Sequence, residues 1–386
     1  MKSKLLFLLF FAGFSSFAQY TLIPDENFEK KLIDLGVDSG TVDGKVLTSN
    51  VSWLTTLEVS SCSIKDLTGI QDFVALTSLN CNYNNDITSL DLSKITALTD
   101  LKCSQNKISS LDLSKNIALT NLSCGSNQLT SLDLSKNTDL KDLYCVRNQL
   151  SSLDLSQNTA LTHLNCGDNP LMNLDLSTNT ALSNLGCWDN QLTSLDLSKN
   201  AALTELYCGH NQLTNLDLFK NPALRNINCG SNQLTSLDLS MNTALLELLS
   251  WNNPLTNLDV SKNIALINLE CRYNQLPNLD VSKNIALKYL SCNSNQLPNL
   301  DVSNNTALIH LNCDSNQLPN LDVSKNTALT DLGCASNQLT NLDVSQNTAL
   351  QGIVCDFNKL TSLDVSKNTA LIGLGLSLIH ISEPRD

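Results

Sequence analysis

Leucine and other apolar residues recur at fixed intervals along most of this 386-residue chain. From Leu98 onward the pattern repeats every 21 residues, as in LTNLSCGSNQLTSLDLSKNTD at residues 119–139. Two 22-residue units beginning at Leu54 and Leu76 precede this series, and an unfinished unit begins at Leu371. The chain thus contains 15 complete units, and a period of this length is typical of solenoid proteins.

Each unit contains two similar halves. Apolar residues two apart, such as Leu122 and Cys124 or Leu132 and Leu134, would point to one side of an extended strand. An Asn follows each pair at a corner, where its amide can satisfy backbone N–H and C=O groups. These corner residues form two columns, Asn84 to Asn358 and Asn116 to Asn368. We therefore predict parallel strands on both sides of each 21-residue coil and a flat, right-handed solenoid with two parallel sheets.

The first half-unit, L-x-x-L-x-C-x-x-N-x-L, resembles the leucine-rich repeat with Cys at its third apolar position. The nested double motif over residues 54–374 resembles bacterial secreted leucine-rich repeat proteins of the internalin-like class. Residues 64–70, IKDLTGI, resemble the first coils of internalin-like proteins. The resemblance implies a β-rich leucine-rich repeat solenoid with little helix, which recognises a protein or a glycan on its sheet face.

The N-terminal residues predict export. Lys2 and Lys4 precede an apolar run at residues 5–14, and Ser16 and Ala18 supply the small residues of a cleavage site. We interpret residues 1–18 as a signal peptide cleaved near Ala18, which predicts a secreted or cell-surface protein. The rest of the chain has no apolar run long enough to span a bilayer.

The two ends of the solenoid depart from the repeat. Residues 19–53 are expected to form an N-terminal cap, with a short amphipathic helix at residues 23–33 that stops before Gly36. The sequence GLSLIHISEPRD at the other end abandons the pattern, and Ile379 stands where a corner Asn belongs. We expect residues 375–386 to be a non-repeat tail that is foreign to the solenoid or results from truncation.

Thirteen of the 14 cysteines form one inward column, Cys81 and then Cys103 to Cys355, broken only by Ser250. In-register parallel strands would hold neighbouring Cβ atoms about 5 Å apart, whereas a disulfide prefers about 3.8 Å. We therefore predict free, buried thiols that pack as small hydrophobic side chains, although disulfides between neighbouring coils are conceivable. Cys62 stands apart, at a corner position. No spacing typical of a metal cluster is present.

Fourteen aspartates, Asp91 to Asp364, form one outward column in the second half of the coils. Nine coils carry Lys three residues later, and Ser or Thr hydroxyls and loop N–H groups offer further compensation. The alternative is Ca²⁺, which prefers oxygen ligands. We expect structural compensation and no cofactor or metal.

Outward positions of the first half vary from coil to coil and include many of the aromatic side chains, together with arginines and histidines. Such residues on a rigid surface are typical of binding hot spots, although the positions could simply be unconstrained. The candidate binding-face residues are Tyr144, Arg147, His163, Trp188, Tyr207, His210, Trp251, Arg272, Tyr273, Tyr289, His310 and Phe357.

The formal net charge of −13 argues against nucleic-acid binding. The four histidines lie far apart and no nucleophile motif accompanies them, so we do not expect an enzyme. The favoured function is an exported, monomeric binding module for a protein or glycan ligand. The alternative is a structural or adhesive surface protein that displays other domains. A third and less favoured function is that of a repetitive array that faces ice or a mineral.

Overall fold

The computed structural model describes residues 18–375. The chain starts with a cap composed of β1 (Tyr20–Leu22), α1 (Glu26–Asp34), β2 (Lys45–Leu47) and α2 (Thr48–Val51), in which β1 and β2 pair antiparallel. A 3-10 turn, η1 (Ile70–Asp72), lies in the first coil. No helix among these residues is long and apolar enough to cross a membrane. The proposed signal sequence lies almost wholly outside the described residues, as do residues 376–386 of the tail.

Sixteen three-residue strands form one parallel sheet, with each strand bonded in register to the strand of the next coil. The strands are β3 (Thr56–Glu58), β4 (Ser78–Asn80), β5 (Asp100–Lys102), β6 (Asn121–Ser123), β7 (Asp142–Tyr144), β8 (His163–Asn165), β9 (Asn184–Gly186), β10 (Glu205–Tyr207), β11 (Asn226–Asn228), β12 (Glu247–Leu249), β13 (Asn268–Glu270), β14 (Tyr289–Ser291), β15 (His310–Asn312), β16 (Asp331–Gly333), β17 (Gly352–Val354) and β18 (Gly373–Gly375). One strand per unit confirms the predicted 21-residue coil, including the unfinished last one.

The prediction of strands on both sides of the coil is wrong for the second half. Across residues 18–375 the second half-units contain turns and no strand. Their backbone N–H groups bond locally, as in Asn137 N to Leu134 O at 3.0 Å and Leu140 N to Asn137 O at 3.2 Å. Ser135 N is likewise taken by the Asp133 carboxylate at 2.9 Å. Donors used within the coil cannot form a ladder to the next coil, so a second sheet does not develop.

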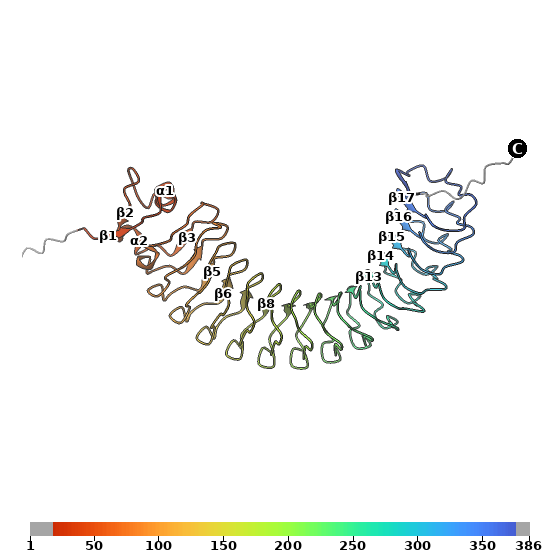
Figure 1. Cartoon of the computed structure of the whole chain (residues 1–386), viewed down its shortest axis with the longest axis horizontal. Helices are drawn as coiled ribbons and strands as arrows, with labels where there is room; N and C mark the ends of the chain where they lie inside the picture. The colour runs from red at the N-terminus through yellow and green to blue at the C-terminus, as the bar shows by residue number, and fades with distance from the viewer. Residues whose placement is uncertain (1–17, 376–386) are drawn as a thin grey trace, which may run out of the picture.

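The solenoid is curved, which corrects the expectation of a flat one. Figure 1 shows an arc in which the strands line the inner, concave side and the second half-units form the outer, convex side. Parallel strands stack about 4.8 Å apart. The turns of the second half-units need a larger spacing between neighbouring coils than the strands do. The convex side therefore advances further per coil than the concave side, and the stack bends toward the sheet.

The interior is one continuous hydrophobic cluster from Ile23 to Leu360. In a typical coil Leu119, Leu122 and Cys124 from the first half meet Leu129 and Leu134 from the second, and each is at most 2% exposed. Narrow coils leave room for aliphatic side chains and Cys. The only fully buried aromatic side chains of the described region are Phe28 and Phe73, which lie in the cap and first coil.

The predicted cap helix is found as α1. It starts three residues later than expected because Asp25, the N-cap, accepts hydrogen bonds from Asn27 N at 2.9 Å and Phe28 N at 3.0 Å. Phe28 stacks on Phe73 with ring centroids 6.0 Å apart, which joins the helix to the first coil. The cap thus covers core surface that the first coil would otherwise expose.

Candidate binding face

The candidate residues divide into two sets on the concave side. Five of them project from the strands: Tyr144 in β7, His163 in β8, Tyr207 in β10, Tyr289 in β14 and His310 in β15. All five are exposed or half-buried, because their neighbours in the strand, such as Leu143 and Leu206, point into the core.

The other seven lie at the corner that follows each strand. Arg147, His210, Tyr273 and Phe357 occupy one corner position with φ of 53–54°, in the left-handed region. Trp188, Trp251 and Arg272 occupy the position just before it. Asp, Asn and His, which favour this conformation, occupy the corner in some coils, but Arg147, Tyr273 and Phe357 do not favour it, and the sequence prediction did not include the left-handed corner.

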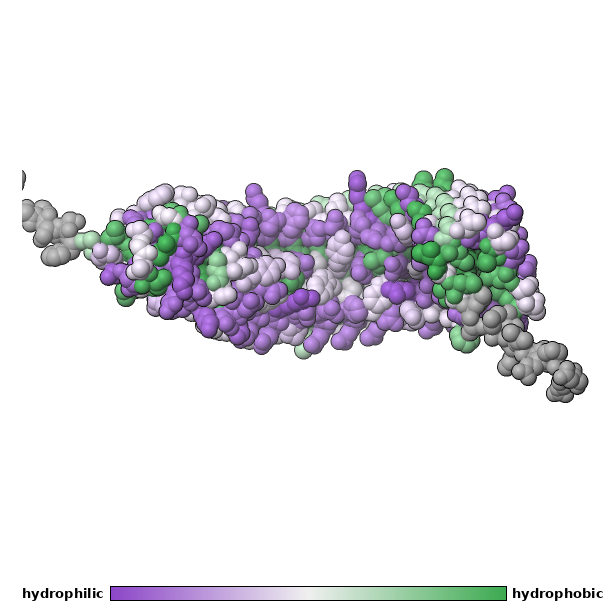
Figure 2. All heavy atoms as spheres, turned by 90° about the horizontal axis from the view of Figure 1, so that it is seen from above, coloured by the Kyte–Doolittle hydropathy of each residue, from purple (hydrophilic) through white to green (hydrophobic). Residues whose placement is uncertain are grey.

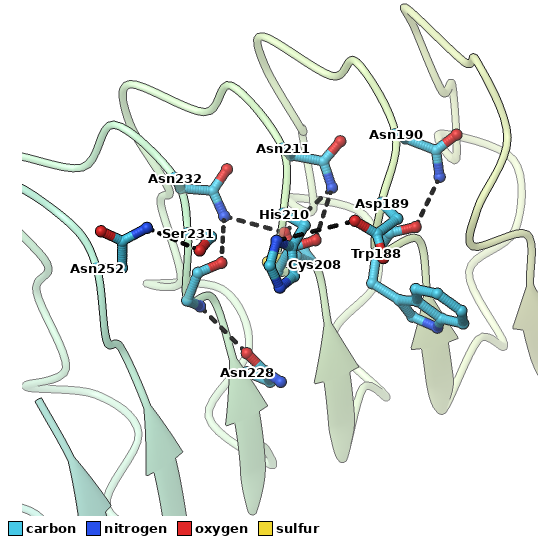
Figure 3. A network of polar contacts seen from close by, with 12 residues as sticks. Trp188, Asp189, Asn190, Cys208, His210, Asn211, Asn228, Ser231, Asn232 and Asn252 are labelled. Atoms are coloured by element: carbon cyan, nitrogen blue, oxygen red, sulfur yellow. Dashed lines mark hydrogen bonds and ion pairs between the residues drawn. The ribbon is translucent and has the colours of Figure 1, made fainter. Parts of the chain in front are cut away.

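The first Asn column holds these corners in place. In the coil of His210, the Asn211 amide nitrogen donates to the carbonyls of Cys187 at 2.9 Å and Cys208 at 3.2 Å. Its amide oxygen accepts the N–H of Leu192 at 3.0 Å. Figure 3 shows the amide nitrogens of Asn190, Asn211 and Asn232 donating in this way, one per coil. The corner asparagines therefore satisfy backbone groups as predicted and give the binding face a rigid base.

Trp188 and Trp251 each lie against a glycine of the preceding coil. A Cβ placed on Gly167 would lie 2.5 Å from Cε2 of Trp188, and one on Gly230 would lie 2.5 Å from Cε2 of Trp251. Glycine is needed here for space, since neither position has a positive φ. Both indoles are half-buried and supported by backbone on one side. They are fixed, flat apolar surfaces rather than free side chains.

The fold brings three predicted residues, Trp251, His210 and Arg272, into one cluster. His210 meets the indole edge-on with centroids 5.1 Å apart, and the Arg272 guanidinium carbon lies 5.3 Å from the ring centroid. Arg272 Nε also lies 3.5 Å from the Glu270 carboxylate. Other candidates form separate pairs, as His163 does with Asp142 at 2.7 Å and Arg147 with Asp168 at 3.4 Å.

Acidic and amide side chains on the strands belong to the same face and were missing from the sequence prediction. Asn184 Nδ2 donates to Glu205 at 2.6 Å, and Glu247 accepts from Asn226 at 3.1 Å and Asn268 at 2.8 Å. The alternation of Glu and Asn at the first strand position, over β9 to β13, was the available signal.

Tyr207 shares the carboxylate of Glu205. Its hydroxyl donates to Glu205 Oε2 at 3.2 Å. Partial burial, reinforced by the charge of Glu205, raises the pKa of Tyr207. The phenol therefore stays protonated and keeps orienting the carboxylate at neutral pH.

The concave face is hollowed over β5 to β9. A cavity of about 390 Å³ there is lined by polar strand residues that include Asp100, Asp142, Tyr144, His163 and Asn184. Figure 2 views the concave face and shows polar residues over most of its length, with apolar residues gathered toward the C-terminal coils. The face therefore combines a polar, hollowed N-terminal half with aromatic corners near its middle.

The convex Asp column forms local turns. The backbone N–H and then the hydroxyl of Ser135 lower the pKa of Asp133, and the same pairing recurs in most coils. The described residues contain no group of three or more His, Cys, Asp or Glu that could hold a metal ion.

The cysteine column is buried and its thiols are free, as predicted; Cys62 alone is half-buried. Burial raises the pKa of Cys81, Cys124, Cys166, Cys229 and Cys292 to about 12. These thiols are protonated core side chains at neutral pH, with no nucleophilic role.

The curved parallel sheet and the repeated motif define a leucine-rich repeat solenoid, and comparisons with known proteins agree. The family described as Leucine Rich repeats (2 copies) matches residues 201–241. The structure of the functional domain of InlJ from Listeria monocytogenes, described as including a cysteine ladder, is 38% identical with a TM-score of 0.83. The similarity covers 87% of this chain and 76% of that chain. The chain belongs to the internalin-like family of leucine-rich repeat proteins.

Two further comparisons show less: one covers a short stretch of the chain, and the other has a lower sequence identity. Internalin J of Listeria monocytogenes serotype 4b (strain F2365) is 38% identical over 73 residues, which are 19% of this chain and 8% of that protein. A leucine-rich repeat protein of Leptospira interrogans has a TM-score of 0.74 at 21% identity, over 84% of this chain and 97% of that chain. The latter shows the shared fold alone.

Proposed function

We propose that the chain is an exported recognition module that binds another protein on its concave face. The observation that carries this proposal is the gathering of supported aromatic side chains, Trp188, Tyr207 and Trp251, on one side of a rigid sheet. Aromatic side chains held in place lose little entropy on binding and are enriched among hot spots. The internalin-like fold supports a protein-interaction role in general and names no partner.

The proposal is tested by screening the chain against arrays of purified extracellular protein domains and of glycans. Any partner found is measured again with the variant Trp188→Ala/Tyr207→Ala/Trp251→Ala. The matched control is Phe219→Ala/Met241→Ala/Ile264→Ala, which removes three exposed apolar side chains from the convex second half-units. Circular dichroism checks that both variants remain folded.

We expect the concave variant to weaken partner binding by at least about tenfold, a loss of about 1.4 kcal/mol. The convex control should bind as the unmodified chain does. Equal binding by the concave variant would refute the proposed face. If ligands were found only among the glycans, the proposal of a protein partner would be contradicted, while the proposed binding face would still stand.

A further inference from the structure

The concave strands carry a local excess of negative charge that the repeat does not explain. Of the 37 acidic residues in the sequence, 14 form the convex Asp column, which leaves 23 against 24 Lys and Arg. The outward strand positions nevertheless carry seven carboxylates and one lysine. They are Glu58, Asp100, Asp142, Glu205, Glu247, Glu270 and Asp331, with Lys102. Residues of this face therefore favour a cationic partner.

The central carboxylates are oriented without being neutralised. Glu205 is held by Asn184 and Tyr207, and Glu247 by Asn226 and Asn268, all of them uncharged donors. Among residues 18–375 neither glutamate forms an ion pair with a lysine or arginine. Each keeps its negative charge available on the surface in a fixed direction.

Arg272 shows how a cation is accommodated on this surface. Its guanidinium lies 5.3 Å from the Trp251 ring centroid, and its Nε lies 3.5 Å from Glu270 in the strand that leads to it. An indole from one coil and a carboxylate from the next thus hold a single guanidinium. Cation–π attraction and charge pairing act together in this arrangement.

The same positions recur three coils earlier without the cation. Trp188 corresponds to Trp251, and the residue that corresponds to Arg272 is Gly209. Tyr207 stands where Glu270 does, and the carboxylate of this strand, Glu205, lies two residues before it. No aromatic ring lies over Gly209, in contrast to Gly167 and Gly230; a Cβ placed there would have Asn228 Oδ1 at 3.0 Å and the Gly230 carbonyl oxygen at 3.1 Å as its nearest neighbours. Trp188 of the preceding coil and Tyr207 and Glu205 of this coil therefore flank a position that has no side chain of its own.

We infer that Trp188, Tyr207 and Glu205 bind an arginine or lysine side chain of the protein partner, seated over Gly209 where Arg272 lies in its own coil. The inference rests on the proposed function and specifies the chemistry that the concave face recognises. Asp189, exposed beside Trp188, adds a second carboxylate at the rim.

The spacing of the carboxylates indicates how the partner continues. Glu205 and Glu247 are two strands apart, which is about 10 Å at the usual strand separation. A polyproline II segment has three residues per turn and advances about 3.1 Å per residue, so basic residues three apart lie on one face, about 9 Å from each other, and would reach both glutamates. The partner segment would then run across the strands, along the length of the solenoid.

The test uses a 12-residue peptide with arginine at every third position and serine elsewhere. The matched ligand replaces each arginine with citrulline, which has the same shape and no charge. Binding to the chain is measured by calorimetry at low and high salt. The variants are Glu205→Gln, which removes the charge, and Gly209→Arg, which supplies a cation from the chain itself. Asp133→Asn is the convex control with the same change in charge.

We expect the citrulline peptide to bind about tenfold or more weakly than the arginine peptide, and Glu205→Gln and Gly209→Arg each to lower arginine-peptide affinity similarly. Asp133→Asn should change little, and high salt should weaken binding. Equal affinity for the two peptides, or for the unmodified chain and Glu205→Gln, would overturn the inference. So would an equal loss in Asp133→Asn, since the effect would then be one of net charge.

Failure of this inference is distinguishable from failure of the proposed function. A partner from the protein array that is lost in the triple concave variant but retained by Gly209→Arg and Glu205→Gln contradicts the cation site and leaves the binding face intact. A partner retained by all three variants contradicts both.

Discussion

Removal of one corner asparagine tests how the solenoid is held together. In Asn211→Ala the carbonyls of Cys187 and Cys208 each keep a second donor, from Asn190 at 3.0 Å and Asn232 at 3.0 Å. The N–H of Leu192 keeps none, because Asn211 Oδ1 at 3.0 Å is its acceptor in the structure. A third carbonyl, that of Gly209, loses the Asn211 amide at 3.3 Å but keeps the N–H of Asp189 at 3.0 Å. The perturbation therefore reduces to one orphaned buried donor and the bonds made by the two amide hydrogens of Asn211.

The magnitude follows from those losses. An orphaned buried N–H costs about 1–3 kcal/mol and each lost hydrogen bond about 1 kcal/mol, so Asn211→Ala should lower the free energy of unfolding by about 3–5 kcal/mol. Asn200→Ala is the matched control from the second column. Its amide donates to Leu176 O at 3.1 Å and Asn179 O at 2.9 Å, while its buried Oδ1 accepts no bond. It orphans no N–H and should cost about 1–2 kcal/mol.

Urea unfolding followed by circular dichroism and tryptophan fluorescence measures both variants, and coincident transitions from the two probes would justify comparing free energies. Equal destabilisation by the two substitutions would refute the reasoning, because the difference between them rests on the N–H of Leu192. A loss below about 1 kcal/mol for Asn211→Ala would do the same, since it would mean that water replaces the amide.

Four other predictions come from the packing and the titrating groups. Gly230→Ala should destabilise the chain by about 1–3 kcal/mol and shift tryptophan emission, because the new Cβ would displace Trp251; Gly209→Ala, whose nearest neighbour is Asn228 Oδ1 at 3.0 Å, should leave the emission unchanged. A thiol reagent monitored by mass spectrometry should label Cys62 in the folded chain well before the buried column, and rapid labelling of the column would contradict its burial. Burial raises the pKa of Cys124 in the folded chain to about 12, above the roughly 8.5 of an exposed thiol. The contribution of this thiol to the free energy of unfolding is therefore complete below about pH 8.5 and is lost as pH rises toward 12. Cys124→Ala should reduce the loss of Tm in alkali. The pKa of Asp133 is lowered in the folded chain, so the contribution of this carboxylate to the free energy of unfolding is present above about pH 4 and disappears as pH falls through the lowered value. Asp133→Asn should therefore flatten the acid side of the plot of Tm against pH. An unchanged acid side would count against the pairing of Asp133 with Ser135.

Much of the fold was predictable because it is local and repeated. The spacing of Leu122 and Cys124 placed both side chains in the interior, and the structure has a strand at that point in each of its coils. Pro24, the acidic residues after it and Gly36 predicted the cap helix, which the structure confirms as α1. The second half-unit has the same apolar spacing as the first, yet it forms turns. Apolar spacing reports which side chains point inward, but it does not show whether the N–H groups are free to pair with the next coil.

The candidate site was likewise predictable in part from the sequence and in part only from the structure. Outward aromatic residues were recognisable from their variation between coils, but their grouping was not. Trp251 meets His210 across an intervening coil, and it can do so because Gly230 between them has no side chain. The role of Glu205 was also missed, since an acidic residue on a strand looks like ordinary surface until its uncharged partners are known.

The sequence by itself determined the period of the coil, the inward columns of Leu, Asn and Cys, and the cap helix, because each depends on residues close together in the chain. Only the tertiary structure decided that the strands line one side, that the stack curves, and that Trp188 and Glu205 flank Gly209, a position without a side chain. Those features depend on how one coil packs on the next. Stacking brings together residues that lie about 20 apart in sequence, and their contacts depend on side-chain size and on which hydrogen bonds remain free.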